Sequence, residues 1–370
     1  MQWNKVMKKC FCFIFAVFLL IPNGRALGQP AAEIPATSLP SLVSATRIEG
    51  PLYFCGEKVP LEIPEVRERL EKEMLLILWN RPQVILWLKR ANRYFPYIEN
   101  TLARNYMPED LKYVAVVESA LLPHAGSSKG AVGFWQFIKS TGRQYGLTIT
   151  RDIDERRNLF TSTNAAVSYF KKLHGLFGSW TLAAAAYNLG EYRLQDAKEN
   201  QQVDNYYHFY LPLETQRYIL KIIAAKLIFS DPARYGFHLQ PQDLYPPLSF
   251  DRIKITAPSN MPLYLVAQAS GTYFKAIKDL NPEIRGHQLK KGTHVIAVPK
   301  GTGPEFHDSF AALVKQWRKE YKMHVYIVKK GDNLSTIAEY FNVPLPALMA
   351  WNDLHPSRFI HPGEQLLIYQ

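Results

Sequence analysis

Cysteine is scarce in this chain, and its scarcity limits what the protein can be. Only three cysteines occur in 370 residues, and Cys10 and Cys12 lie in an N-terminal segment with the pattern of a secretory signal. Cys55 would stand alone in the mature protein, which excludes an internal disulfide. No His or Cys motif surrounds Cys55, so we interpret it as a structural residue rather than a reactive thiol.

Metal-ligand patterns and further long apolar runs are also missing. No group of cysteine, histidine and carboxylate residues has metal-ligand spacing, so we predict no metal and no other cofactor. Beyond the N-terminus, no segment is apolar enough to span a bilayer. With 47 % hydrophobic and 13 % aromatic residues, the chain is expected to be globular rather than disordered.

Residues 1–28 combine the features of a signal peptide. Lys5, Lys8 and Lys9 precede an apolar segment at 10–21, and "RALG" offers a small-residue cleavage site. The apolar segment is short for a membrane span, which favours a cleaved signal. The alternative is an uncleaved N-terminal anchor that keeps the protein associated with the envelope membrane. Either way, we predict an exported protein.

Positive charge predominates, with a formal net charge of +12. Four basic residues and no acids lie in residues 1–28, so removing that segment leaves about +8. Such a charge suits an anionic polymer or surface. An exported protein seldom meets nucleic acid, so we predict no nucleic-acid partner and favour cell-wall glycopeptide, lipopolysaccharide or acidic lipid. Scattered solvated lysines would explain the charge equally well.

The chain first passes through a Pro-, Ala- and Ser-rich segment, 29–60, which we expect to be a loosely ordered lead-in. Over 61–240, apolar residues recur at helical spacing and no strong alternation occurs, which predicts a mostly helical domain. The predicted helices cover residues 64–79, 82–106, 107–122, 164–178, 180–200 and 211–231.

Two short units repeat after residue 250. The unit at 323–370 has the order strand, helix, helix, strand, and 251–300 matches it at a constant offset of 71 residues. Asn281 corresponds in this way to Asn352. Between the units, 301–322 is expected to be a charged linker with helical character. Asp332 is expected to cap the first helix of the second unit.

Glu118 is the candidate for chemistry, in "YVAVVESALLPHAGSSKGAVGFWQF" (113–137). On a helix it shares a face with Val114 and Ala115, and an apolar wall raises the pKa of a carboxyl by disfavouring its charged form. A carboxyl that is protonated near neutral pH suits general acid catalysis. A surface glutamate that merely follows an apolar run is the alternative.

Four blocks in order carry a resemblance to a known family: "ESALLPHAGSSKGAVGFWQFIKSTGRQYGL", "DERRNLFTSTNAAVSYFKKL", "AAAAYNLGE" and "LPLETQRYI". The chain resembles the soluble-type (SLT) lytic transglycosylases with C-terminal LysM repeats, over roughly residues 50–370. The resemblance implies a mostly α, lysozyme-like catalytic domain over 61–240. It implies two small α/β (βααβ) LysM-like modules, a degenerate one at 251–300 and an intact one at 323–370.

The resemblance also implies the reaction. Such enzymes of the bacterial periplasm or envelope cleave the bond between N-acetylmuramic acid and N-acetylglucosamine in peptidoglycan glycan strands. They leave a 1,6-anhydromuramoyl end without hydrolysis. Glu118 would first protonate the glycosidic oxygen and then take the proton of the sugar's own 6-hydroxyl, which attacks in place of water. Ordinary glycosidases need two carboxylates, whereas this reaction needs one.

Four substrate-binding positions follow from the first block. Ser127 would donate to the acetamido region of the substrate, and Gln136 would hydrogen-bond sugar or peptide; each is otherwise an ordinary loop residue. Phe134 and Trp135 would pave the cleft, because sugar rings present apolar faces to aromatic side chains. Core packing is the alternative for both.

Three further positions come from the later blocks. Tyr187 would point its phenol at Glu118 or at the substrate; a buried, satisfied tyrosine is the alternative. Asn188 would shape the turn beside it. Glu214 would hold Tyr187 or line the cleft, although it also suits the start of a helix.

The LysM resemblance implies a glycan-binding site on two loops of the last module. The positions are Gly331, Asp332, Asn333, Leu334, Trp351, Asn352 and Asp353. Capping and turn formation are their alternative roles. The degenerate copy is expected to have lost glycan binding and to act as a spacer, while the intact copy tethers the enzyme to its polymer.

Two other readings stay open at this stage. A hydrolytic muramidase would need a second carboxylate, for which Asp152, Asp154 and Glu155 are available. A non-catalytic wall-binding scaffold would need neither carboxylate. Glu118, Gln136 and Tyr187 occurring together argues against the scaffold. Protein partners cannot be inferred from the sequence.

Overall fold

The computed structural model describes residues 40–370 except 304, 321–322, 353, 356–357 and 370. The signal peptide predicted over 1–28, and residues 29–39 of the predicted lead-in, lie outside these described residues. Among the helices that the structure describes, none is both long and apolar enough to cross a membrane.

The described part of the lead-in has defined secondary structure. It forms α1 (Leu42–Ala45) and an antiparallel hairpin of β1 (Leu52–Phe54) and β2 (Glu57–Val59). Phe54 is 0 % exposed and packs in the same core as the helices that follow. The expected loose segment is therefore wrong for residues 52–59, where Leu52, Phe54 and Val59 are buried.

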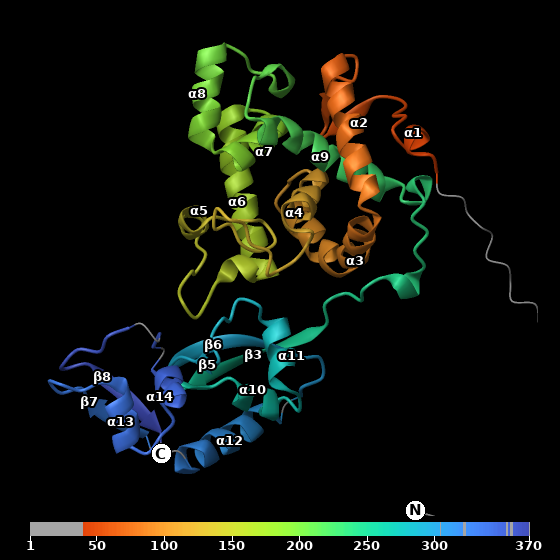
Figure 1. Cartoon of the computed structure of the whole chain (residues 1–370). Helices are drawn as coiled ribbons and strands as arrows, with labels where there is room; N and C mark the ends of the chain where they lie inside the picture. The colour runs from red at the N-terminus through yellow and green to blue at the C-terminus, as the bar shows by residue number, and fades with distance from the viewer. Residues whose placement is uncertain (1–39, 304, 321–322, 353, 356–357, 370) are drawn as a thin grey trace, which may run out of the picture. The chain divides into compact units, whose positions relative to one another are not determined.

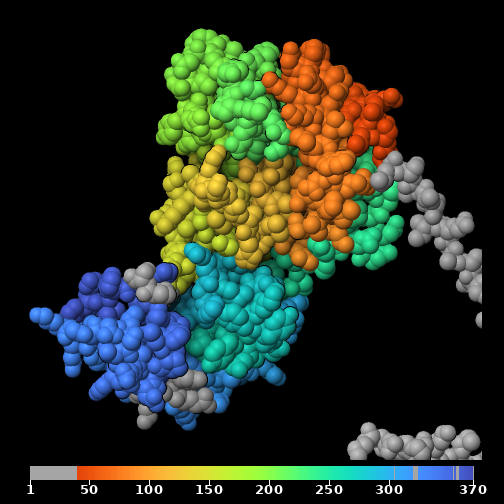
Figure 2. All heavy atoms as spheres, in the orientation of Figure 1, coloured from red at the N-terminus to blue at the C-terminus, as the bar shows by residue number. Residues whose placement is uncertain are grey.

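A helical body follows, coloured orange to green in Figure 1. Its α-helices are α2 (Pro64–Trp79), α3 (Arg81–Arg104), α4 (Lys112–Ser119), α5 (Lys139–Gln144), α6 (Leu159–Phe177), α7 (Trp180–Leu189), α8 (Glu191–Gln201) and α9 (Leu213–Ser230). Its 3-10 turns are η1 (Glu109–Leu111), η2 (Glu155–Arg157), η3 (Tyr206–His208), η4 (Ala233–Tyr235) and η5 (Pro241–Asp243). Figure 2 shows the atoms of this body packed in one continuous mass. The predicted mostly helical fold is confirmed.

The alanine run of α7 allows this helix to pack closely in the centre of the helical body. Residues 183–186 are all alanine and all 0 % exposed, and α7 packs on both α6 and α9. Small side chains let three helices approach closely. The helix predicted over 180–200 is divided in two because Gly190 adopts φ +96°, a backbone conformation that favours glycine. Tyr187 and Asn188 therefore stand at the end of a helix fixed in the core.

The first C-terminal module is built on the antiparallel pair of β3 (Phe250–Ala257) and β6 (Gly292–Pro299). Its other elements are β4 (Met261–Pro262), α10 (Tyr264–Ala269), α11 (Phe274–Leu280), β5 (Gln288–Leu289) and α12 (Phe306–Glu320). The linker predicted over 301–322 is largely α12, an amphipathic helix. Phe306, Phe310 and Trp317 are at most 7 % exposed and belong to the core of this module.

The second module has the predicted strand, helix, helix, strand order. Its elements are β7 (Met323–Ile327), α13 (Leu334–Tyr340), α14 (Leu345–Trp351) and β8 (Gln365–Tyr369). The same asparagine hydrogen bonds occur in both modules. Asn352 donates to the carbonyls of Leu348 and Leu367, and Asn281 of the first module donates in the same way to Ile277 and Ala297. Each asparagine ties a helix end to the last strand.

Candidate active site

Glu118 lies in the last turn of α4, where the chain leaves the core. Val114, Ala115 and Val116 of the same helix are 0 % exposed, and they carry the half-buried Glu118 to the edge of the apolar interior. The helix ends directly afterwards, because Ala120 and Leu121 adopt positive φ values of 53° and 58°. The apolar run thus fixes the carboxyl in place.

Burial and one hydrogen bond decide the charge of this carboxyl. Burial raises the pKa of Glu118 to about 7, while the hydrogen bond from Tyr218 lowers it. Tyr218 Oη donates to Glu118 Oε1 over 2.5 Å. Burial and the neighbouring carboxylate raise the pKa of Tyr218 well above its usual value, so this phenol remains a donor. Glu118 can therefore gain or lose a proton near neutral pH.

Glu118 lines a cavity of about 570 Å³. Its other walls are Ser127, Ser128, Lys129, Ala131, Gln136, Phe137, Ile138, Thr141, Tyr169, Tyr187, Asn188, Leu189, Gly190, Glu191 and Glu214. A cavity of similar volume, about 600 Å³, includes His238 and Glu99, but its one carboxyl among the described residues, that of Glu99, is paired with Lys112, whereas burial raises the pKa of Glu118 to about 7. The cavity at Glu118 is therefore the better candidate for acid–base chemistry. It brings together six predicted site residues: Glu118, Ser127, Gln136, Tyr187, Asn188 and Glu214.

Tyr187, predicted to point at Glu118 or at the substrate, lines the cavity without a hydrogen bond to Glu118. Its Oη donates to the carbonyl of Trp135 over 2.5 Å, and its ring stacks on Phe170 at 4.6 Å between centroids. Tyr218 takes the expected place. The sequence contains one signal for it: Glu214 and Tyr218 are four residues apart on α9, so they share a face of the helix.

The loop after α4 is held by its own polar groups. Gln136, at φ 49°, donates from Nε2 to the carbonyls of Ala125 and Gly133. Ser127 Oγ accepts from the amide of Ala131. Both side chains line the cavity while they shape the loop, so their structural and substrate-binding roles coexist.

Phe134 and Trp135 do not pave the cleft. Each is 1 % exposed, and neither lines the cavity. Phe134 packs edge-to-face on Tyr94, and Trp135 Nε1 donates to Thr163 Oγ1 over 3.0 Å. The alternative of core packing is the correct one, because these two rings anchor the loop to α3 and α6.

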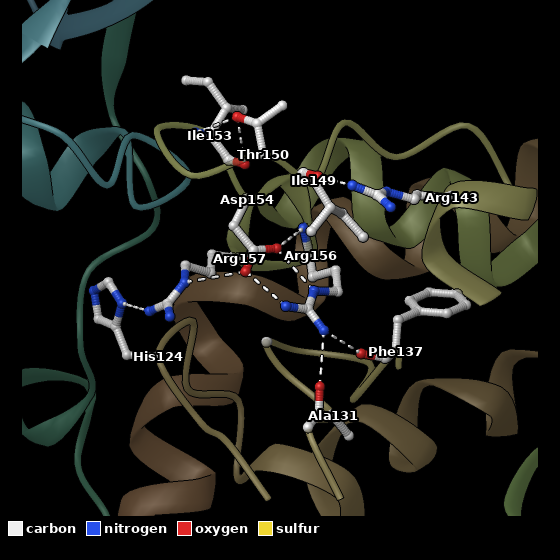
Figure 3. A network of polar contacts seen from close by, with 12 residues as sticks. His124, Ala131, Phe137, Arg143, Ile149, Thr150, Ile153, Asp154, Arg156 and Arg157 are labelled. Atoms are coloured by element: carbon white, nitrogen blue, oxygen red, sulfur yellow. Dashed lines mark hydrogen bonds and ion pairs between the residues drawn. The ribbon is translucent and has the colours of Figure 1, made fainter. Parts of the chain in front are cut away.

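A buried ion pair supports the same loop, as Figure 3 shows. Arg156 makes two 2.8 Å hydrogen bonds to Asp154 and donates to the carbonyls of Gly130 and Phe137. Burial raises the pKa of Asp154, but Arg156 outweighs it and holds that pKa below its usual range. The loop also passes so close that a Cβ on Gly133 would lie 1.8 Å from the Arg156 carbonyl oxygen. Position 133 therefore requires glycine.

The three acids considered as a second carboxylate lie elsewhere. Asp152, Asp154 and Glu155 do not line the cavity, and Asp154 is committed to Arg156. Two acids that do line it are already engaged. Glu191 accepts from Tyr169 and Lys172, and Glu214, whose side chain is 69 % exposed, pairs with Lys129 at 3.4 Å.

Asn188 has a structural contact in the helical body, and the helix cap in the last module differs from the prediction. Asn188 Oδ1 accepts from Thr215, which joins the end of α7 to α9. The helix cap predicted for Asp332 belongs instead to Asn333, whose side chain accepts from the amide of Thr336. Asp332 accepts from the amide of Lys329 and so closes the preceding turn.

The remaining loop positions of the last module are placed as follows. Gly331 adopts φ 94°, and Leu334 begins α13. Trp351 packs edge-to-face on Tyr369, and the side chain of Asn352 is used within the fold. Asp353 lies outside the described residues.

Models of known families match three parts of the chain. They are the Transglycosylase SLT domain at 95–210, the LysM-like domain of lytic transglycosylase MltD at 249–315, and the LysM domain at 326–368. Membrane-bound lytic murein transglycosylase D of Escherichia coli is 33 % identical over 336 residues, which cover 86 % of this chain and 73 % of that protein. The predicted resemblance is confirmed.

Two solved structures are less similar to this chain than the relative above. The 70-kDa soluble lytic transglycosylase from Escherichia coli is 19 % identical, with a TM-score of 0.35, over 46 % of this chain and 31 % of that one. The lytic transglycosylase Slt from Pseudomonas aeruginosa is 17 % identical, with a TM-score of 0.31, over 43 % and 27 %. This chain thus matches under a third of either.

Proposed function

Because the chain belongs to the family of membrane-bound lytic murein transglycosylase D, we propose that Glu118 is the acid and base of a lytic murein transglycosylase. The substrate is the bond between N-acetylmuramic acid and N-acetylglucosamine in peptidoglycan. The observation that carries the proposal is a half-buried carboxyl with a pKa of about 7 in the wall of a 570 Å³ cavity.

One carboxyl is sufficient for a reaction that consumes no water. Protonated Glu118 donates its proton to the glycosidic oxygen as the bond to the muramoyl C1 breaks. The 6-hydroxyl of the same sugar then attacks C1, and the carboxylate takes the hydroxyl proton. The product is a 1,6-anhydro end, and Glu118 is protonated again. A pKa near the working pH suits both steps.

The state of the neighbouring acids favours this reaction over hydrolysis. A hydrolytic glycosidase needs a second free carboxylate as nucleophile or as base for water. Glu191 is engaged by Tyr169 and Lys172, whereas Glu214 is exposed and makes a weaker, 3.4 Å contact with Lys129. Tyr218 supports the cycle by stabilising the carboxylate that forms after the first proton transfer.

The remaining site residues orient the substrate in this proposal. Ser127 and Gln136 present their polar groups to the sugar from the loop, and Tyr187 and Asn188 shape the opposite wall. In the second module, the loops near Gly331 and Trp351 hold N-acetylglucosamine-containing glycan and tether the enzyme to the wall. The signal pattern of residues 1–28 directs the chain to the periplasm or envelope.

Three matched amide substitutions test the assignment. Glu118→Gln, Glu191→Gln and Glu214→Gln are compared by the release of soluble fragments from purified peptidoglycan. We expect Glu118→Gln to lower the rate by about 10²- to 10⁴-fold, as loss of a general acid–base does. The other two should retain activity. A loss at Glu191 or Glu214 as large as that at Glu118, in a folded variant of a protein that releases reducing muramic acid ends, would indicate a two-carboxylate hydrolase instead.

A further inference from the structure

A second cavity, of about 230 Å³, adjoins the active site. Val117, the neighbour of Glu118 on α4, and Lys221 of α9 form one side of it. Its remaining walls come from α2, from the first two turns of α3 and from Arg217. No residue lines both this cavity and the one that contains Glu118.

Helix α9 relates the two cavities to the reacting carboxyl. Glu214 lines the active-site cavity, Tyr218 binds Glu118, and Lys221 lines the second cavity. These residues lie on successive turns, so at the helical rise Glu214 and Lys221 are about 10 Å apart along the axis. The two cavities therefore lie within about two turns of each other along α9, with the Tyr218–Glu118 hydrogen bond between them.

Two side chains in the walls of the second cavity have donor groups without a hydrogen-bond acceptor. Trp87 is only 8 % exposed, yet its Nε1 has no hydrogen-bond partner among the described residues, and the buried Nε2 of Gln83 has none there either. The one carboxylate in the wall, Glu73, is 1 % exposed and already accepts two bonds from Arg217. A buried donor that is left unpaired is destabilising, and a ligand acceptor would satisfy it.

Charge in and around this cavity is also positive. The ammonium of Lys221 has no hydrogen bond or ion pair with any described residue, and it acts on Glu118 only through space. Asn80 caps α3, a helix of 24 residues, by accepting from the Gln83 amide, and the other N-terminal amides of this helix favour an anion. Leu76 and Val84 add aliphatic surface. The site thus suits a carboxylate on a short apolar stem.

We propose that this cavity binds a carboxylate of the peptide attached to the muramic acid, so that the enzyme selects its substrate by the peptide as well as by the sugars. The inference rests on the proposed function. In glycan that carries peptides, the lactyl carboxyl of each muramic acid is used in the amide bond to the peptide, so the sugars are uncharged, whereas the peptides carry carboxylates and aliphatic side chains. Only the peptide part of the substrate matches the donors, the charge and the apolar walls together.

Gln83→Glu is the decisive variant. It keeps the size of the side chain, and an acid in the first turn of α3 is favoured by the helix dipole, so the fold is retained. The new carboxylate at position 83 repels the carboxylate of the ligand. We expect kcat/KM for peptide-bearing glycan to fall about tenfold, the loss of one charge-assisted hydrogen bond. The control is glycan that is stripped of its peptides and whose freed lactyl carboxylates are then blocked as amides, and its value should not change.

Controls separate this effect from added charge and from catalysis. Ile85→Glu places the same charge at a 38 % exposed position on α3 and should leave both substrates unaffected. Lys221→Arg, which keeps the charge, should retain the preference for peptide. Equal losses on both substrates, or no loss on the peptide-bearing one, would overturn the proposal.

A binding measurement distinguishes failure of this inference from failure of the proposed function. Free wall peptide is titrated by calorimetry into Glu118→Gln and into Glu118→Gln combined with Gln83→Glu. Binding to the first and about tenfold weaker binding to the second support the cavity whether or not catalysis is observed. Equal affinity, or no binding to either, contradicts it. If wild-type protein forms no anhydro product from either glycan, the proposed function fails separately.

Discussion

Tyr218 and Glu118 are 100 residues apart in the chain, and their side chains meet in a 2.5 Å hydrogen bond. Burial disfavours the charged carboxylate, and the phenol favours it. The result is a pKa of about 7 rather than the usual 4.5. The pair therefore controls the pH range in which a single carboxyl can serve as acid and then as base.

Removing the phenol should move the pH range of activity. Tyr218→Phe deletes the bond that stabilises the carboxylate, so the pKa of Glu118 rises. We expect the alkaline limb of the kcat/KM profile to shift upward by about 1 pH unit, since a hydrogen bond to a charged group contributes about 1.5–3 kcal/mol. The maximal rate should fall as well, because the carboxylate intermediate loses its donor.

Tyr187→Phe is the matched control for that profile. Its hydroxyl donates to the Trp135 carbonyl and not to Glu118. The alkaline limb should therefore stay closer to that of wild-type protein. A larger shift for Tyr187→Phe than for Tyr218→Phe would count against our assignment of the two phenols.

Stability should depend on pH through Glu118, with a sign that follows from its raised pKa. Between about pH 4.5 and pH 7 the folded protein keeps a proton that the unfolded chain releases, so the free energy of unfolding falls as pH rises. The full loss, reached above pH 7, is about 3 kcal/mol. Glu118→Gln should match wild-type stability near pH 4 and exceed it at pH 8. Denaturant unfolding at both pH values measures this, and a parallel pH dependence in both proteins would refute it.

The buried ion pair below the active-site loop should be costly to break. Asp154→Asn leaves Arg156 without its counter-charge, and we expect about 3–5 kcal/mol of destabilisation together with a lower kcat. Glu155→Gln, which retains an acceptor for the Thr148 amide, should cost about 1 kcal/mol or less. Chemical denaturation compares the two variants, and equal stabilities would show that the pair does not hold the loop.

The second C-terminal module should be separable from catalysis. Asn352→Ala removes the side chain that bonds Leu348 and both polar groups of Leu367, and each buried group left unpaired costs about 1–3 kcal/mol. In so small a module we expect local unfolding. Affinity for insoluble wall should fall about tenfold or more, while kcat on short soluble glycans should not change.

Asn281→Ala provides the control in the first module. It breaks the equivalent bonds to Ile277 and Ala297, and that module is the copy expected to have lost glycan binding. Wall affinity, measured by co-sedimentation, should therefore respond to Asn352→Ala and hardly to Asn281→Ala. The reverse order would assign the tether to the first module.

Apolar periodicity predicted the helices well, and α2 spans the expected residues 64–79. It could not predict partners that are distant in sequence. Tyr187 and Tyr218 are both plausible neighbours of Glu118 in the sequence, and only the packing of α7 and α9 distinguishes them. Similarly, the charges of 301–322 suggested a linker, whereas every third or fourth residue of α12 is apolar and buried in the first module.

Two other errors have local causes. Phe134 and Trp135 follow glycine in a loop, and such a pattern does not say whether an aromatic ring faces a ligand or the core. Asp332 and Asn333 both suit a helix cap, and the boundary of α13 falls one residue later than expected. In each case the correct answer depends on contacts that the sequence does not specify.

The most direct test of the central claim is the fate of solvent oxygen. Purified peptidoglycan is digested in water labelled with heavy oxygen, and the released muropeptides are identified by mass. A single-carboxyl transglycosylase gives products one water lighter than hydrolytic ones, with no label, and gives them only when Glu118 is present. Reducing muramic acid ends that carry the label would mean that water attacks, and would contradict the assignment of Glu118 as the one acid and base.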